Sequence, residues 1–155
     1  MNTAKLNDWL QLAASIGVVV SLIFVGLEIQ QARKIATADI FQQRTALLLQ
    51  QLGLAIPADE AHRVRTKEMA GEGLTQEEDW LLYTLAAARF AYWENNHFQY
   101  QLGLLDEEQW QASLTAIRTQ ADTRLFRVYW PSERSRVRKS FADAVDAVLR
   151  ERRGQ

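Results

Sequence analysis

Residues 9–27 carry no charge, and this stretch constrains the fold more than any other feature of the sequence. Asp8 and Glu28 bound it, and most of the nineteen residues between them are large and apolar. At about 1.5 Å per residue, a helix of this length measures roughly 28 Å, close to the roughly 30 Å hydrocarbon core of a bilayer. Apolar side chains surround the whole helix instead of forming one stripe. This pattern favours a single membrane span over the alternative, a buried central helix of a soluble bundle.

The residues on either side of the apolar stretch predict an uncleaved signal anchor and its orientation. A secretory signal peptide would have Lys5 alone as its basic region, and no small-x-small cleavage site follows the apolar run. Lys5 is offset by Asp8, whereas three basic residues follow the span. They are Arg33, Lys34 and Arg44. We therefore expect a single-span membrane protein with its N-terminus outside and its C-terminal body in the cytoplasm.

Length and composition predict one modest domain after the anchor. About 125 of the 155 residues remain for it, enough to bury an apolar core. The chain has no cysteine, which excludes a disulfide scaffold, Cys-ligated zinc, iron–sulfur clusters and thiol catalysis, and agrees with a reducing compartment. Residues 58–110 hold eleven acidic and four basic residues, whereas residues 132–155 hold seven basic and four acidic ones. This asymmetry suggests contacts between segments, or between the basic C-terminal segment and anionic lipid.

The periodicity of the sequence predicts an all-α fold in which a long N-terminal transmembrane helix continues into a cytoplasmic bundle of about four further helices. No Gly or Pro occurs from Leu27 through Leu52, so one helix is expected from about residue 4 to 54. The expected division is 1–56 for the transmembrane helix with its extension and 57–155 for the bundle. Shorter helices are predicted over about 57–69, from 75 to about 102, over 106–122 and over 132–152.

Capping motifs mark the starts of two of these helices. Thr75 with Glu78 forms a capping box, in which a hydroxyl and a carboxylate each satisfy an orphan backbone donor. Asp106 with Gln109 is predicted to form a second box. Gly103, just before it, is expected to end the preceding helix in the left-handed conformation. Together these signals predict two helices joined by a tight turn.

The predicted third helix is rich in aromatic residues whose large side chains point in several directions, so we expect it in the middle of the bundle. These residues are Trp80, Tyr83, Phe90, Tyr92, Trp93, Phe98 and Tyr100. A loop before Pro131 is predicted to contain three more: Phe126, Tyr129 and Trp130.

Three segments give the chain a resemblance to a family. They are the Ser21–Gln31 end of the apolar helix, the Trp93–Trp110 block, and Tyr129–Trp130 followed by a basic helix. Over nearly its whole length the chain resembles an uncharacterised family of bacterial proteins with one N-terminal transmembrane helix and a helical cytoplasmic domain. The resemblance implies this architecture. It implies no activity, because no catalytic role is attached to those residues.

Glu94 and His97 have the spacing that places a carboxylate and an imidazole on one helical face in di-iron bundles. Such a site needs further glutamates from other helices, and the sequence identifies none, so no metal or other cofactor is predicted. We interpret Glu94, Asn95, Asn96 and His97 as a buried polar knot inside an aromatic layer, with a small-ligand pocket as the alternative. The candidate hydrogen-bonding partners are Arg118, Arg124 and Arg127.

Other motifs give no support for catalysis or nucleic-acid binding. Residues 59–62, Asp-Glu-Ala-His, match a helicase signature by letters, but no glycine-rich phosphate loop accompanies them. No Gly-x-Ser-x-Gly elbow is present. The arginine-rich C-terminal segment has no nucleic-acid-binding motif and belongs to a slightly acidic chain, so a solvated face, anionic lipid or a neighbouring subunit is favoured. We predict neither an enzyme nor a nucleic-acid partner.

Small residues on one face of the span predict self-association. Ala14, Gly17 and Ser21 share a face that allows close helix approach, and this face continues through Phe24 to Glu28. Lipid contact alone explains the same face almost as well. If the helices formed a ring, Glu28 would lie at the mouth of a pore, where carboxylates favour cations.

Three hypotheses for function follow. The first is a non-enzymatic, single-span inner-membrane protein that forms homo-oligomers and presents its bundle as an interaction or scaffold module. Its expected partners are lipid and further copies of the chain, with another membrane protein as an alternative. The second is a homo-oligomeric ion channel lined by the first helix. The third is a helical metal- or ligand-binding protein centred on Glu94 and His97.

Overall fold

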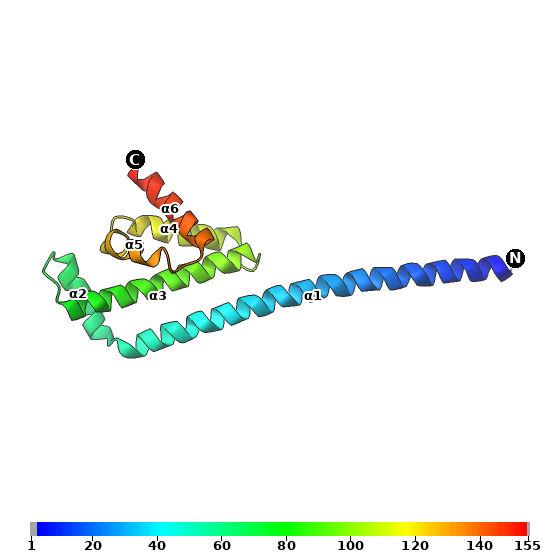
Figure 1. The fold of residues 1–155 in the computed structure, drawn as a ribbon, viewed down its shortest axis with the longest axis horizontal. Helices are drawn as coiled ribbons and strands as arrows, with labels where there is room; N and C mark the ends of the chain where they lie inside the picture. Colours follow the sequence, from blue (N-terminus) through cyan, green and yellow to red (C-terminus); the bar gives the residue numbers. More distant parts are fainter. Residues whose placement is uncertain (1–2, 155) are drawn as a thin grey trace. The chain divides into compact units, whose positions relative to one another are not determined.

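The computed structural model describes the backbone of residues 3–154 and the side chains of residues 9–50, 56–152 and 154. Every regular element in these residues is helical (Figure 1). The six α-helices are α1 (Thr3–Ala55), α2 (Ala58–Met69), α3 (Gln76–Gln101), α4 (Glu107–Gln120), α5 (Trp130–Glu133) and α6 (Lys139–Arg153), and a π-helical segment, η1 (Leu125–Tyr129), precedes α5. The predicted all-α fold with one long apolar N-terminal helix followed by a bundle is confirmed.

The chain divides into two compact units, Met1–Thr37 and Ala38–Gln155. The second unit therefore begins inside α1 and not at residue 57, where the sequence suggested a boundary. Ala38, Phe41, Thr45 and Leu49 explain the earlier start, because they recur at helical spacing and are buried or half-buried. Within this unit the Phe41 ring lies 4.8 Å from that of Phe98, measured between ring centroids.

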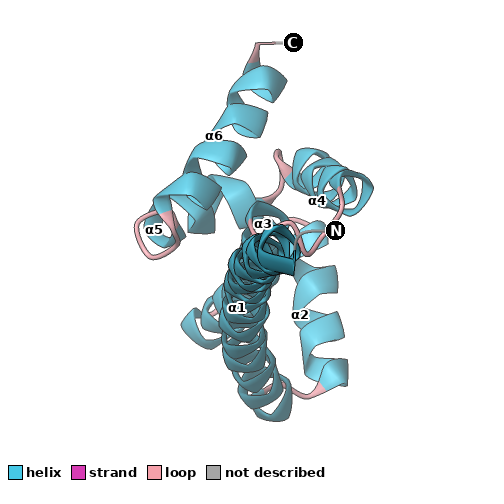
Figure 2. Cartoon of the chain, turned by 90° about the vertical axis from the view of Figure 1, so that its right-hand side faces the viewer, coloured by secondary structure: helices cyan, strands magenta, loops and turns pink. Residues whose placement is uncertain are grey.

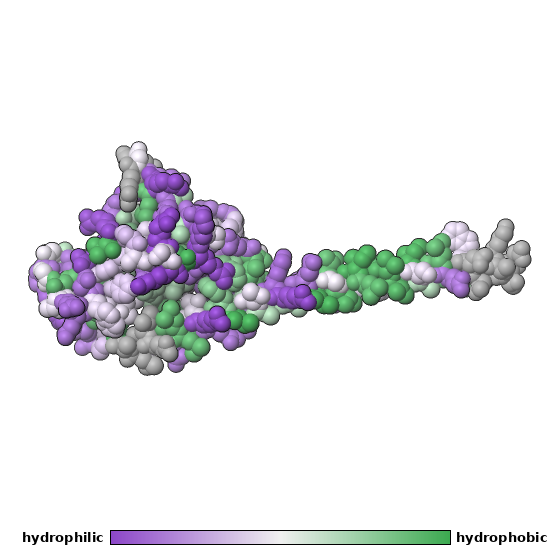
Figure 3. Space-filling model, viewed as in Figure 1, coloured by the Kyte–Doolittle hydropathy of each residue, from purple (hydrophilic) through white to green (hydrophobic). Residues whose placement is uncertain are grey.

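The first unit is a helix whose apolar side chains remain uncovered. From Trp9 to Leu27 the large apolar residues are 47–71% exposed. Figure 3 shows this stretch as an almost continuous apolar surface, coloured green. Among the described residues, α1 is the one helix long and apolar enough to cross a membrane. Its exposure is consistent with a single span or with a signal sequence.

The second unit buries its own core around α3, as the aromatic content of this helix predicted. α3 contacts α2, α4, η1 and α6. Figure 2 shows α2, α4 and α6 on different sides of it. Phe90 and Trp93 of α3 are 1% and 2% exposed, and Phe141 and Val145 of α6 are fully buried. The Phe90 ring lies 5.4 Å from that of Phe126 and 5.1 Å from that of Trp130, so one aromatic cluster joins α3 to η1 and α5.

The predicted turns between α2, α3 and α4 are largely confirmed. Thr75 and Glu78 form the complete capping box, with the Glu78 N–H donating to the Thr75 hydroxyl and the Thr75 N–H donating to the Glu78 carboxylate. Gly103 has a φ of 72°, the left-handed conformation expected of it. Asp106 accepts a hydrogen bond from the Gln109 N–H at 2.8 Å, but the described residues show no reciprocal bond from the Gln109 side chain.

The prediction of a loop before Pro131 was wrong. The expected loop is helical, as η1 and α5, because Phe126, Tyr129 and Trp130 are buried and anchor it to the core. Pro131 falls in the first turn of α5, where its missing N–H is not needed.

The last helix was predicted to begin at residue 132, but α6 begins at Lys139. Arg138 explains the difference, since its backbone is extended and its N–H donates to Glu94 Oε1 at 2.8 Å. This bond to another helix holds residue 138 outside α6.

Candidate functional site

The Glu94–His97 segment of α3 separates into residues with different surroundings. His97 is buried, whereas Glu94 is half-buried and accepts the hydrogen bond from the Arg138 backbone. Asn96 Nδ2 donates to the Ser113 hydroxyl of α4 at 3.1 Å. The segment therefore connects α3 to α4 and to the start of α6.

The arginines expected to satisfy this segment lie elsewhere, so that part of the prediction was wrong. Arg118 pairs with Glu151 at 3.5 Å, and Arg124 pairs with Asp79. Arg127 forms no side-chain hydrogen bond in the described part of the chain and lines a surface hollow beside the turn between α2 and α3. The segment is instead contacted by Arg138, which precedes α6. The sequence missed this contact because the backbone N–H of Arg138, and not its side chain, makes the bond.

His97 lies in an aromatic layer. Its ring centroid is 4.9 Å from Trp110 and 5.8 Å from Phe141. Burial, together with the nearby positive charge of Arg138, lowers the pKa of His97 below its ordinary value and keeps the imidazole neutral. Its Nδ1 atom and the Asn95 Oδ1 atom are buried with no hydrogen-bond partner in the structure. In the described residues no group of three or more His, Asp or Glu side chains could hold a metal ion.

Arg138 contacts both α1 and α3 and so links these helices to the start of α6. Its guanidinium carbon lies 3.7 Å from the Phe98 ring centroid of α3 and 4.6 Å from that of Phe41 in α1. Cation–π contacts of this kind, added to the Arg138 backbone bond to Glu94, hold Phe41 of α1 against α3 and the start of α6. Gln99 adds a hydrogen bond from Nε2 to the Ala38 carbonyl at 3.2 Å.

The predicted self-association face lies in the first unit. Ala14, Gly17, Ser21, Phe24 and Glu28 are all exposed. A Cβ atom added at Gly17 would meet nothing within 4 Å apart from the adjoining residues and backbone of its own helix. The Ser21 hydroxyl donates to the Gly17 carbonyl at 2.8 Å, so it is satisfied inside the helix.

A charge network around Glu78 holds α2 to α3. Its carboxylate accepts hydrogen bonds from Lys67 at 2.7 Å and from Arg63 at 3.0 Å, both in α2. The bond from Lys67, the backbone bond from Thr75 and the bond from Arg63 lower the pKa of Glu78 to about 2. Sequence reasoning identified the capping role of this residue and missed its two basic partners, because they belong to the preceding helix.

Two tyrosine networks tie α3 to the segment around η1. The Tyr129 hydroxyl donates to Asp79 Oδ1 at 2.7 Å, and Arg124 pairs with the same carboxylate. These two bonds, that from Arg124 first, lower the pKa of Asp79. The Tyr83 hydroxyl donates to the buried Glu133 carboxylate, which also accepts from Arg136 at 2.7 Å. No sequence signal marked either network.

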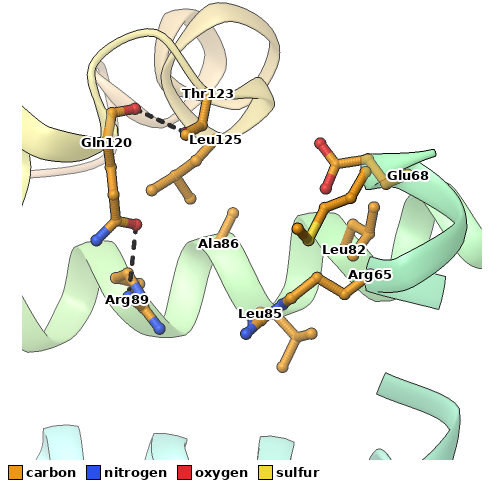
Figure 4. Close-up of a pocket in the computed structure, with 10 residues that line it drawn as sticks. Arg65, Glu68, Leu82, Leu85, Ala86, Arg89, Gln120, Thr123 and Leu125 are labelled. Carbon is orange, nitrogen blue, oxygen red and sulfur yellow. Dashed lines mark hydrogen bonds between the residues drawn. The ribbon is translucent and has the colours of Figure 1, made fainter. Parts of the chain in front are cut away.

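Two surface hollows on α3 share three residues, Arg65, Leu85 and Arg89. The first, of about 250 Å³, lies between α2, α3 and the turn after α4 (Figure 4). The second, of about 520 Å³, lies further along α3 and is bounded by Leu49 of α1 and Ala116 of α4. Sequence reasoning found neither, since their residues come from separate helices with no motif to connect them.

Comparisons of the chain with family models, curated proteins and solved structures found no match. No family is therefore identified. The structure supports the coarser part of the resemblance: the protein is all-helical in its described residues and has one long apolar N-terminal helix.

Proposed function

We propose that this protein is a single-span inner-membrane protein that self-associates through its first helix and presents the helical unit 38–155 in the cytoplasm as an interaction module. The exposure of the Trp9–Leu27 side chains carries the proposal. The second unit has a core of its own, to which none of those side chains contributes. A bilayer supplies an apolar phase of matching thickness.

The basic residues that follow the span support the cytoplasmic location of the second unit. Arg33 and Lys34 are exposed and lie within the first two turns after Glu28. Basic residues close to a span are retained on the cytoplasmic side.

Because the chain has no cysteine, single-cysteine variants test this orientation. In intact spheroplasts, a membrane-impermeant maleimide should label Thr3→Cys and should label Ser135→Cys only after permeabilisation. The reverse pattern would invert the proposed orientation.

Two glycines of the span offer a matched test of self-association. Gly17 lies on the predicted face, and Gly26, nine residues later, lies about 180° around the helix from it. At both positions an added Cβ would meet nothing within 4 Å apart from the adjoining residues and backbone of the helix itself, so both can take a larger side chain. Any difference between variants at the two sites must come from neighbouring molecules.

Native mass spectrometry in detergent should show a defined homo-oligomer for the wild type and for Gly26→Leu, and a shift towards monomer for Gly17→Leu. A monomeric wild type, or equal behaviour of the two variants, would contradict association through this face. We do not extend the proposal to a pore, because the Ser21 hydroxyl is committed to the helix backbone and Phe24 lies on the same face.

A further inference from the structure

Arg65 and Arg89 differ from several arginines of the bundle because no carboxylate among the described residues pairs with them. Arg63, Arg124 and Arg136 each form an ion pair with a carboxylate. In the described part of the chain Arg65 has no hydrogen bond, and Arg89 has one, to the Gln120 side-chain oxygen at 3.4 Å. Both arginines are exposed and both line the two hollows. Two like charges at one site, without an anion between them, favour binding of an anion.

The floor of the hollows is apolar. Leu82, Leu85 and Ala86 of α3 line the first hollow with Leu125, and Leu85 continues into the second, which extends to Trp93. From residue 82 to residue 93 the helix rises about 16 Å. The hollows therefore combine an apolar surface with two guanidinium groups at their common edge.

Glu68 defines where an anion would bind. It lines the first hollow only. Figure 4 shows its carboxylate beside α2, separated from the guanidinium groups of Arg65 and Arg89. Repulsion from Glu68 disfavours an anion at that end, so the favourable position is the edge that the two arginines share.

We propose that these hollows bind a small anionic amphiphile, with a carboxylate or phosphate monoester between Arg65 and Arg89 and its aliphatic part on the apolar floor. Guanidinium groups suit this anion because they present parallel N–H donors to two oxygens at once. The second volume is of the size of small-molecule sites, and the first is slightly smaller. This site is separate from the proposed membrane role and does not depend on it.

Binding of hexyl phosphate to the full-length chain in nanodiscs of zwitterionic lipid tests the proposal, with empty nanodiscs as the blank for partitioning into the bilayer. Titration calorimetry should detect binding of hexyl phosphate and weaker binding of hexanol, which lacks the anion. Arg65→Gln and Arg89→Gln should each weaken hexyl phosphate binding several-fold to about tenfold. Arg150→Gln is the matched control, because Arg150 is exposed and has no side-chain hydrogen bond in the described residues.

Two further experiments identify the source of the anion and exclude loss of folding as the cause of weaker binding. If nanodiscs that contain phosphatidylglycerol weaken binding to the wild type, a lipid headgroup competes for the site; if they leave it unchanged, the site selects a free anion. Thermal unfolding of each variant establishes that the bundle is folded. Binding unchanged in both arginine variants, equal binding of hexanol, or no binding to the folded wild type would overturn the proposal.

Discussion

The apolar part of α1 and helix α3 contain similar side chains in opposite surroundings. Phe24 in α1 is 61% exposed, whereas Phe90 in α3 is 1% exposed, and the same contrast holds for Trp9 and Trp93. α3 is covered by four other elements of its unit, while the apolar residues of the first unit have no cover within it. An uncovered apolar surface of this length is unusual for a soluble monomer and indicates contact with another apolar phase. The two helices therefore do not differ in apolar content. They differ in whether other elements of their own unit cover their apolar side chains.

The largest expected effect is in the bundle. Phe90→Ala should lower its free energy of unfolding by about 3–5 kcal/mol, because it opens a cavity among Trp93, Phe126 and Trp130. Urea unfolding of the detergent-solubilised chain, followed by tryptophan fluorescence, measures it. Phe24→Ala is the control and should leave the bundle unchanged. Equal losses of unfolding free energy in the two variants would contradict the conclusion that α3, and not the apolar part of α1, forms the core of the bundle.

A charge in the apolar segment should act on membrane insertion and not on the bundle. Val19→Lys places a charge near the centre of the segment, where insertion costs about 2.5–3.5 kcal/mol more. The fraction of chain recovered in washed membranes should fall. Ile40→Lys, at an equally exposed position of the same helix in the second unit, should not change that fraction. Normal recovery of the Val19 variant would contradict the account.

Loss of the α3 cap should have a smaller effect, confined to the second unit. Thr75→Ala removes the hydroxyl that accepts from the Glu78 N–H and should cost about 0.5–2 kcal/mol. Thr75→Ser keeps the hydroxyl and should retain most of the stability. The same urea experiment compares them, and an alanine variant as stable as the serine variant would show that the cap contributes little.

Mild acid should also weaken the bundle and not the span. Because the folded state lowers the pKa of His97, the unfolded chain takes up the proton first, and stability falls as the pH drops below about 6.5. His97→Gln should flatten the stability profile between pH 7 and 5. A further loss below about pH 4.5 belongs to carboxylates whose pKa values are lowered, Glu78 and Asp79 among them, and should persist in this variant. A His97 variant with the profile of the wild type would show that His97 does not titrate in this range.

The sequence predicted the features that depend on local pattern. The uninterrupted run without Gly or Pro gave α1, and the Thr75–Glu78 pair gave the start of α3. The sequence did not predict the features that depend on tertiary contact. The segment after residue 124 is helical because its aromatic residues are buried, and Arg138 is held out of α6 by Glu94, forty-four residues earlier.

The candidate sites show the same difference between features set by local pattern and features set by tertiary contact. The small-residue face of α1 follows from spacing alone, and its role stays a prediction. The surroundings of Glu94 to His97 could be found only from the packing of the bundle. The same holds for Arg65 and Arg89, which lie on different helices and line the same hollows. Neither arginine belongs to a motif, so the sequence carries no signal for their common edge.

The intact mass of the chain recovered from carbonate-washed membranes tests whether an uncleaved first helix attaches the protein to the membrane. We expect the full 17.8 kDa chain in the membrane pellet, released only by detergent. Recovery of a shortened chain that lacks the apolar segment would identify a signal sequence. Recovery of the full chain in the soluble fraction would show that something other than a bilayer covers this helix. Either result would contradict the account.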